Sequence, residues 1–182
     1  MVIAQQKRKE NIAEYLLYLW QLEDLLRACK CDPQIVDEQI VAKYDVDEKQ
    51  RAEIRDWYDN LLQMMRAENV TQSGHLQISK NVLIHLNDLH AQLLAHPDKC
   101  EDYVSEYYRT LPIIVQLRST LPEEQRAGEL ETCFNALYGI MVMRLQGKTI
   151  SQATQDAIAQ ISRFIALLAK YFHEDEQQPL FN

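Results

Sequence analysis

Apolar residues recur every three or four positions through most of this 182-residue chain, in stretches separated by prolines and helix-capping residues. This spacing lines apolar side chains along one face of an α-helix, whereas a half-buried strand needs strict alternation. The chain has four glycines and five prolines, fewer than the turns of a β-rich domain usually require. The pattern predicts an all-α protein, with residues 1–182 forming a single-domain bundle of six or seven helices.

Capping residues and prolines predict where these helices begin and end. Asp32 is expected to cap a short helix that starts at Pro33, and Asp98 is expected to cap another. Capping-box patterns, with Glu or Gln three positions after the cap, predict further starts at Asp45, Thr120 and Thr149. Gly147 can adopt the left-handed conformation that ends a helix. The expected helices cover residues 6–29, 33 onward, 45–69, 75–95, 98–120, 120–146 and 149–173, followed by a frayed tail at 174–182.

Two features refine this helical pattern. Pro112 has no N–H to donate to the carbonyl of Tyr108, so the helix over residues 98–120 is expected to be kinked or broken there. The last helix is expected to bury one apolar stripe. That stripe consists of Ile150, Ala157, Ile158, Ile161, Ile165, Leu168 and Phe172.

The charge balance bears on partners and compartment. The formal net charge is −8, so phosphate backbones and anionic membrane surfaces are unfavourable partners. No uncharged apolar run approaches the roughly 18 residues of a membrane span, and the N-terminus lacks the apolar stretch of a signal peptide. We therefore expect a cytoplasmic protein that binds neither nucleic acid nor membrane.

No spacing in the chain forms a catalytic, nucleotide-binding or metal-binding signature. Glycine-rich phosphate loops, a nucleophile elbow, HExxH and paired CxxC motifs are all absent. Cys29 and Cys31 form a CxC without a second pair at zinc-site spacing, and reduced thiols at a helix end explain them better. We therefore predict no catalytic residues, no metal and no cofactor.

Two charged residues stand inside apolar arcs of their helices. Glu23 lies among apolar positions of the first helix, and Arg144 lies among those of the helix ending near Gln146. We expect the two to meet as a buried ion pair, because a buried charge without a partner is costly. The alternatives are that both reach solvent near their helix ends, or that the pair lines a ligand pocket.

Histidine and tyrosine supply the other candidate site residues. His90 points toward the apolar side of its helix, where a core histidine with one hydrogen bond is the usual interpretation and a ligand or catalytic role is the alternative. Aromatic clusters in the first and fifth helices are explained by core packing or by a ligand groove. They comprise Tyr15, Tyr18 and Trp20, and Tyr103, Tyr107 and Tyr108.

Three segments carry a resemblance to a known family. They are residues 11–27, 78–90 and 132–145, and the likeness spans nearly the whole chain. The chain resembles a bacterial domain-of-unknown-function family, typical of gut anaerobes. The resemblance implies an all-helical cytoplasmic protein and supplies no activity or site residues.

The function is therefore unknown from the sequence, and the leading hypothesis is a non-enzymatic helical interaction or binding protein. Exposed apolar residues should then form a patch, with Leu17, Ile84 and Ile113 as candidates, and homodimerisation is the simplest outcome. The rival is a small enzyme or small-molecule sensor with a polar pocket between helices around Glu23, Arg144 and His90.

Overall fold

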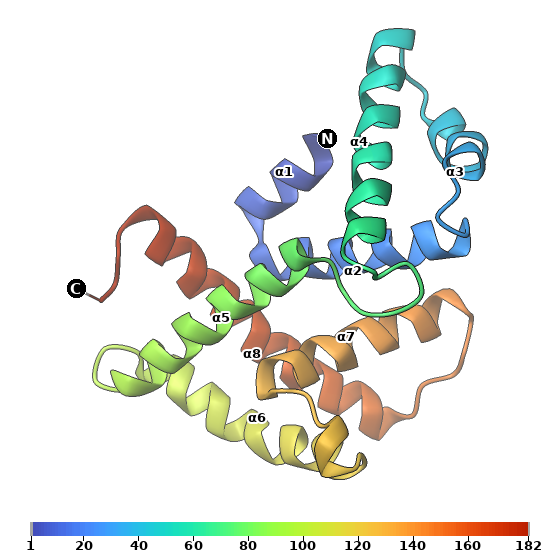
Figure 1. The fold of residues 1–182 in the computed structure, drawn as a ribbon. Helices are drawn as coiled ribbons and strands as arrows, with labels where there is room; N and C mark the ends of the chain where they lie inside the picture. Colours follow the sequence, from blue (N-terminus) through green and yellow to red (C-terminus); the bar gives the residue numbers. More distant parts are fainter. Residues whose placement is uncertain (1, 182) are drawn as a thin grey trace. The chain divides into compact units, whose positions relative to one another are not determined.

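The computed structural model describes residues 2–181, and these residues form helices, turns and loops without a β-strand (Figure 1). The all-α prediction is confirmed, with eight α-helices in this range rather than six or seven. The elements are α1 (Val2–Glu10), α2 (Ile12–Ala28), α3 (Pro33–Gln39), a 3₁₀ helix η1 (Val41–Lys43), α4 (Glu48–Ala67), α5 (Gln77–Ala95), α6 (Glu101–Ser119), a 3₁₀ helix η2 (Glu123–Gln125), α7 (Glu129–Leu145) and α8 (Gln152–Gln177).

The described chain divides into two compact units. Unit 1 comprises residues 1–10 and 14–82, and unit 2 comprises residues 11–13 and 83–182. The division falls within α5, so this helix contributes its first turns to unit 1 and the rest to unit 2. The expectation of a single domain stays a prediction.

In unit 1, α3 and η1 pack against α4 (Figure 1). The inward face of α4 buries Tyr58, Leu61, Leu62 and Met65. Asp32 caps α3 as predicted, because its carboxylate accepts the free amide hydrogens of Gln34 and Ile35.

In unit 2, α6, α7 and α8 pack on one another (Figure 1). Their core is apolar and aromatic, and it includes the completely buried Phe134 and Phe164. Gly147 ends α7 in the predicted left-handed conformation, with φ of 67°. Its amide donates to Arg144 O, and the next amide donates to Met143 O, which satisfies carbonyls at the helix end.

The prediction of one continuous first helix over residues 6–29 is wrong, because the structure has two helices there. Helix α1 ends at Glu10 and α2 begins at Ile12, with Asn11 between them in a non-helical conformation. The Asn11 side-chain oxygen accepts the amide hydrogen of Ala13 at 3.0 Å. Asparagine competes in this way for backbone donors, which favours a new helix start over continuation.

Several predicted helix starts are also wrong, and at two of them the side chain of a nearby residue provides the cap. Asp47, and not Asp45, caps α4 through the amide of Gln50, and Ser151, and not Thr149, caps α8. Pro122 and Glu123 open only the 3₁₀ turn η2, and α7 begins after Gly128. The residue before α6 is Cys100 instead of Asp98. Acidic and hydroxyl side chains are frequent in these loops, so spacing alone does not select the one that caps.

Pro112 bends α6 without dividing it. The helix is continuous over Glu101–Ser119 and bends near the proline, so the predicted kink is confirmed and the predicted break is not. The buried residues Tyr107, Thr110 and Ile114 lie on either side of Pro112, so core packing holds both halves. The proline itself is exposed, where loss of one hydrogen bond is tolerated best.

The C-terminal helix is longer than predicted. Helix α8 continues to Gln177, into the segment expected to fray. Beyond it, the amide of Leu180 donates to Asp175, and the ring of Phe181 stacks on His96 at 4.6 Å between centroids. Across the described residues, no helix is long and apolar enough to cross a membrane.

Candidate functional site

Glu23 lies buried in unit 1, with its side chain 1% exposed. One carboxylate oxygen accepts the backbone amide of Leu76 at 3.0 Å and the Ser79 hydroxyl at 2.7 Å. The other lies 2.6 Å from His75 Nδ1 and 4.0 Å from the Arg27 guanidinium. Glu23 thus caps the start of α5, where first-turn amides otherwise lack acceptors.

Arg27, one turn after Glu23 on α2, contacts the loop that connects α4 to α5. Its guanidinium donates to Val70 O at 3.1 Å and to Gly74 O, and pairs with Asp24 at 2.8 Å. Trp20 adds a stacking contact with the His75 ring, at 4.4 Å between centroids. This set of contacts fixes the connection between α4 and α5 onto α2.

Arg144 does not form the predicted pair with Glu23. It lies exposed in the last turn of α7, while the oxygens of Glu23 already accept hydrogen bonds within unit 1. The predicted buried pair is therefore wrong. The long arginine side chain at a helix end reaches water, where its charge needs no protein partner. The partners of the buried Glu23 carboxylate are a histidine, a serine and a backbone amide. The spacing of residues within α2 could not predict these partners, because they lie outside that helix.

His90 lies buried in unit 2 among aromatic rings. Its Nδ1 hydrogen-bonds the hydroxyl of Tyr103 at 2.6 Å. The rings of Tyr103, Tyr107 and Phe164 surround it, with centroids 5.1–5.9 Å away. This is the environment of a core histidine satisfied by one hydrogen bond. Burial lowers the pKa of His90, and the Glu129 carboxylate opposes that shift more weakly.

We expect His90 to make the protein less stable in mild acid. Because its pKa is below the ordinary 6.5 in the folded chain, the unfolded chain binds the proton first as pH falls. Its contribution to the free energy of unfolding should therefore be complete above pH 6.5 and decline below it. Urea titrations from pH 7.5 to 5 should show a steeper decline for the natural protein than for His90→Gln. His85→Gln, at an exposed position, is the control, and identical slopes for all three would contradict the assignment.

The tyrosines of α6 divide between core and surface. Tyr103 and Tyr107 are buried, and Tyr107 donates its hydroxyl hydrogen to Glu129 at 2.8 Å. Burial and this carboxylate raise the pKa of Tyr107 to about 12, so it stays a hydrogen-bond donor at neutral pH. Tyr108, the third member of the predicted cluster, is 63% exposed. Core packing therefore accounts for two of the three.

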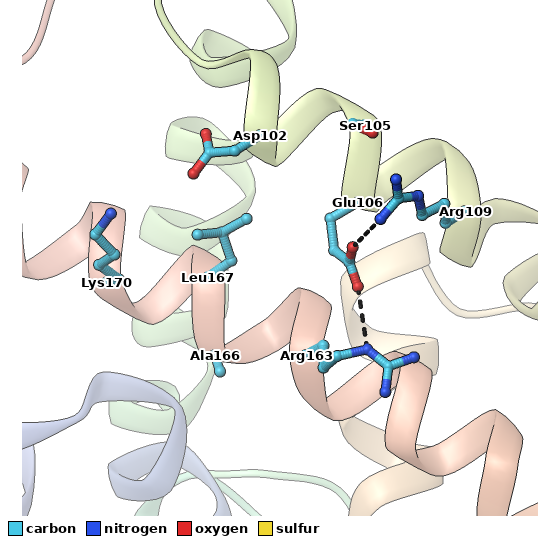
Figure 2. A pocket seen from close by; sticks show the side chains of 8 residues that line it. All are labelled: Asp102, Ser105, Glu106, Arg109, Arg163, Ala166, Leu167 and Lys170. Carbon is cyan, nitrogen blue, oxygen red and sulfur yellow. Dashed lines mark ion pairs between the residues drawn. The ribbon is translucent and has the colours of Figure 1, made fainter.

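A charged groove runs between α6 and α8, with a volume of about 640 Å³ (Figure 2). Ala166 and Leu167 form its apolar part. Glu106 lies between two arginines, with its oxygens 3.5 Å from Arg109 Nη1 and 3.5 Å from Arg163 Nε. The groove is completed by Asp102, Ser105 and Lys170.

Glu106 is the most enclosed charge of this groove, with its side chain 14% exposed. It also accepts a hydrogen bond from Gln160 Nε2 at 2.8 Å. The groove residues escaped the sequence prediction, although each helix contributes them at the spacing i, i+3, i+4, i+7. That signal was present in both segments, but it indicates a shared face and not which two helices meet.

The outer face of α6 carries a second feature, an apolar stripe exposed to solvent. Tyr108 and Val115 are 63% and 56% exposed, and Pro112 between them is also exposed. We call the set Val104, Tyr108, Leu111, Pro112 and Val115 the α6 stripe, because its members follow one another at helical spacing along one face.

The three residues predicted to form an apolar patch have different environments. Ile84 is exposed, while Leu17 and Ile113 are half-buried. On α6 the predicted patch residue was Ile113, whereas the most exposed apolar side chains of this helix are those of Tyr108 and Val115. The inward positions of this helix are instead set by Tyr103, Tyr107, Thr110 and Ile114.

The fold and these sites define an all-helical protein with a buried carboxylate centre in unit 1 and a charged groove in unit 2. Among residues 2–181, no cluster of three or more His, Cys, Asp or Glu is arranged to hold a metal ion. The chain belongs to the domain-of-unknown-function family DUF4924, whose model matches residues 1–179. The predicted family resemblance is confirmed, while its bacterial origin stays a prediction. No curated protein and no solved structure matches the chain.

Proposed function

We propose that this protein is a non-enzymatic interaction protein and that it forms a homodimer through the α6 stripe. The observation that carries the proposal is the exposure of Tyr108 and Val115 on one continuous helix face. Contiguous apolar surface on a soluble protein marks an interaction site more often than scattered apolar residues do. The half-buried Val104 and Leu111 extend this face along the helix.

A second copy of the chain fits the stripe because the stripe is self-complementary in antiparallel register. A register that sets Val104 of one copy beside Val115 of the other satisfies two-fold symmetry. It also sets Tyr108 beside Leu111 of the other copy, near the centre of the pair. Apolar side chains then face apolar side chains along the whole contact.

Charge complementarity favours the same register. Glu101 and Arg118 lie toward opposite ends of α6, so the antiparallel arrangement brings each beside its opposite in the other copy. The guanidinium of Arg118 already lies 3.9 Å from Glu129 within the same chain. Its side chain nevertheless remains about one-third exposed, so it can also pair with Glu101 of the second copy. Antiparallel helices also oppose their macrodipoles favourably.

The test is the oligomeric state of variants measured by sedimentation velocity. Val115→Glu should weaken the dimer at least tenfold, because it places a charge without a partner inside the apolar contact, beside Val104 of the other copy. Ile84→Glu, a matched change at an exposed apolar position outside α6, should leave the dimer unchanged. A natural protein that stays monomeric at high concentration, or a dimer dissociated by Ile84→Glu instead, would contradict the proposal.

Charge exchange tests the register itself. Glu101→Lys and Arg118→Glu should each weaken their own homodimer, because each creates like-charge pairs at both ends. Mixed together, the two variants should form a heterodimer with opposite charges at both ends. If the mixture does not dimerise while Val115→Glu still disrupts the dimer, the antiparallel register is refuted. The α6 stripe would then remain the dimer surface, with a different register.

The proposal includes a reducing compartment, the cytoplasm, as the place of action. Cys29, Cys31, Cys100 and Cys133 are free and buried, which suits a chain kept reduced. The net charge of −8 argues against nucleic acid as the partner. The rival sensor hypothesis around Glu23, Arg144 and His90 has weaker support, because hydrogen bonds within the protein already engage Glu23 and His90.

A further inference from the structure

The geometry points to a binding site for a monocarboxylate with an apolar body in the groove between α6 and α8 (Figure 2). The site is built around Glu106, which holds Arg109 and Arg163 on either side of it. This inference does not depend on the homodimer. At about 100° per residue, the groove residues of α6 lie roughly 120° around the helix from the α6 stripe.

The guanidinium groups of Arg109 and Arg163 line the groove, and the acceptors around them engage only some of their N–H donors. Their side chains are 70% and 62% exposed, although each lies 3.5 Å from the same carboxylate. One Glu106 oxygen is shared with the Gln160 amide, and Arg163 also donates to the Gln160 side-chain oxygen. A guanidinium has several N–H donors, so these few acceptors leave donors on both arginines available to a ligand.

The charges select the class of ligand. Around Glu106, two positive charges face one negative charge, which leaves one excess positive charge in a chain of net charge −8. A monoanion neutralises this excess, whereas a phosphate dianion would place surplus negative charge beside Glu106. Two guanidiniums match the planar, two-oxygen geometry of a carboxylate.

The rest of the groove fits an apolar body. Ala166 and Leu167 line the groove from α8, the helix that also carries Arg163. At the far end, Asp102 already accepts the Tyr171 hydroxyl at 2.6 Å, and Lys170 lies 3.7 Å from Glu174. The volume of about 640 Å³ lies within the ordinary range for small-molecule sites.

The experiment is a titration of the full-length chain, labelled with ¹⁵N, with hexanoate as the probe. Hexanoate should shift amide signals of α6 and α8 in a saturable way. Hexan-1-ol, which has the apolar body without the charge, and inorganic phosphate, which has the charge without the body, should bind at least fivefold more weakly. Equal binding of either comparator would overturn the assignment of a monocarboxylate site.

Variants locate the carboxylate. Arg109→Gln and Arg163→Gln should each weaken hexanoate binding at least fivefold, and Glu106 keeps one arginine in each single variant. Lys80→Gln, at an exposed position in unit 1, is the matched control for loss of one positive charge and should bind as the natural protein does. Unchanged binding in both arginine variants, or an equal loss in Lys80→Gln, would overturn the site.

Discussion

Replacing Glu23 with alanine is expected to lower the free energy of unfolding by about 3–5 kcal/mol. The substitution removes the acceptor for the Leu76 amide and the Ser79 hydroxyl, and both donors are then left buried. It also removes the carboxylate beside His75 and Arg27, which holds the start of α5 against α2. Urea unfolding followed by circular dichroism measures the loss.

Two companion variants separate capping from general disruption of α2. Asp24→Ala removes the neighbouring carboxylate, which is about half exposed and pairs with Arg27 at 2.8 Å. It should cost no more than about 1 kcal/mol, as exposed ion pairs do. Glu23→Gln, which keeps one acceptor oxygen, should fall between the two. Equal losses for Glu23→Ala and Asp24→Ala would show that the Glu23 centre does not hold α5.

Replacing Phe164 with alanine is expected to cost about 3–5 kcal/mol of unfolding free energy through the cavity it leaves. Phe164 is completely buried in unit 2. Its ring lies 5.4–5.9 Å, between centroids, from those of Tyr103, Tyr107 and His90. These three rings are held by other contacts and cannot close the space. Urea unfolding of the variant measures the cost.

Phe172→Ala provides the matched control on the same helix. Phe172 is half-buried, so the same chemical change removes less buried surface and should cost clearly less. The comparison also separates sequence from structure, because the predicted stripe of the last helix included Phe172 and omitted Phe164. A larger loss for Phe172→Ala would support the predicted stripe against the observed packing.

The predicted apolar stripe of α8 shows how far periodicity reaches. Ile161, Ile165 and Leu168 are buried as expected, because each lies at the centre of an apolar arc that can face only the core. Phe164 lies at the edge of that arc, beside exposed Arg163. Whether an edge position is buried depends on the width of the surface that the neighbouring helices cover. Periodicity within one helix does not contain that information.

The candidate sites depended still more on tertiary structure. The sequence indicated that Glu23 would be buried and would need a partner, which follows from an acidic residue inside an apolar arc. It could not indicate that His75 and Ser79 would supply it, since they lie more than fifty positions away. Arg144 occupied a similar place in its own arc, but its longer side chain reaches solvent from the last turn of α7, whereas the shorter side chain of Glu23 is buried.

By itself, the sequence determined the all-α class, the cap of α3 by Asp32, the end of α7 at Gly147 and the bend at Pro112. These depend on interactions within a few residues, which local chemistry decides. Tertiary structure decided that a distant carboxylate would cap α5 and that Glu106 would gather Arg109 and Arg163 beside a groove. Those arrangements require knowledge of which helices meet and at which turn, because the free energy of a buried or shared charge depends on neighbours brought together only by packing.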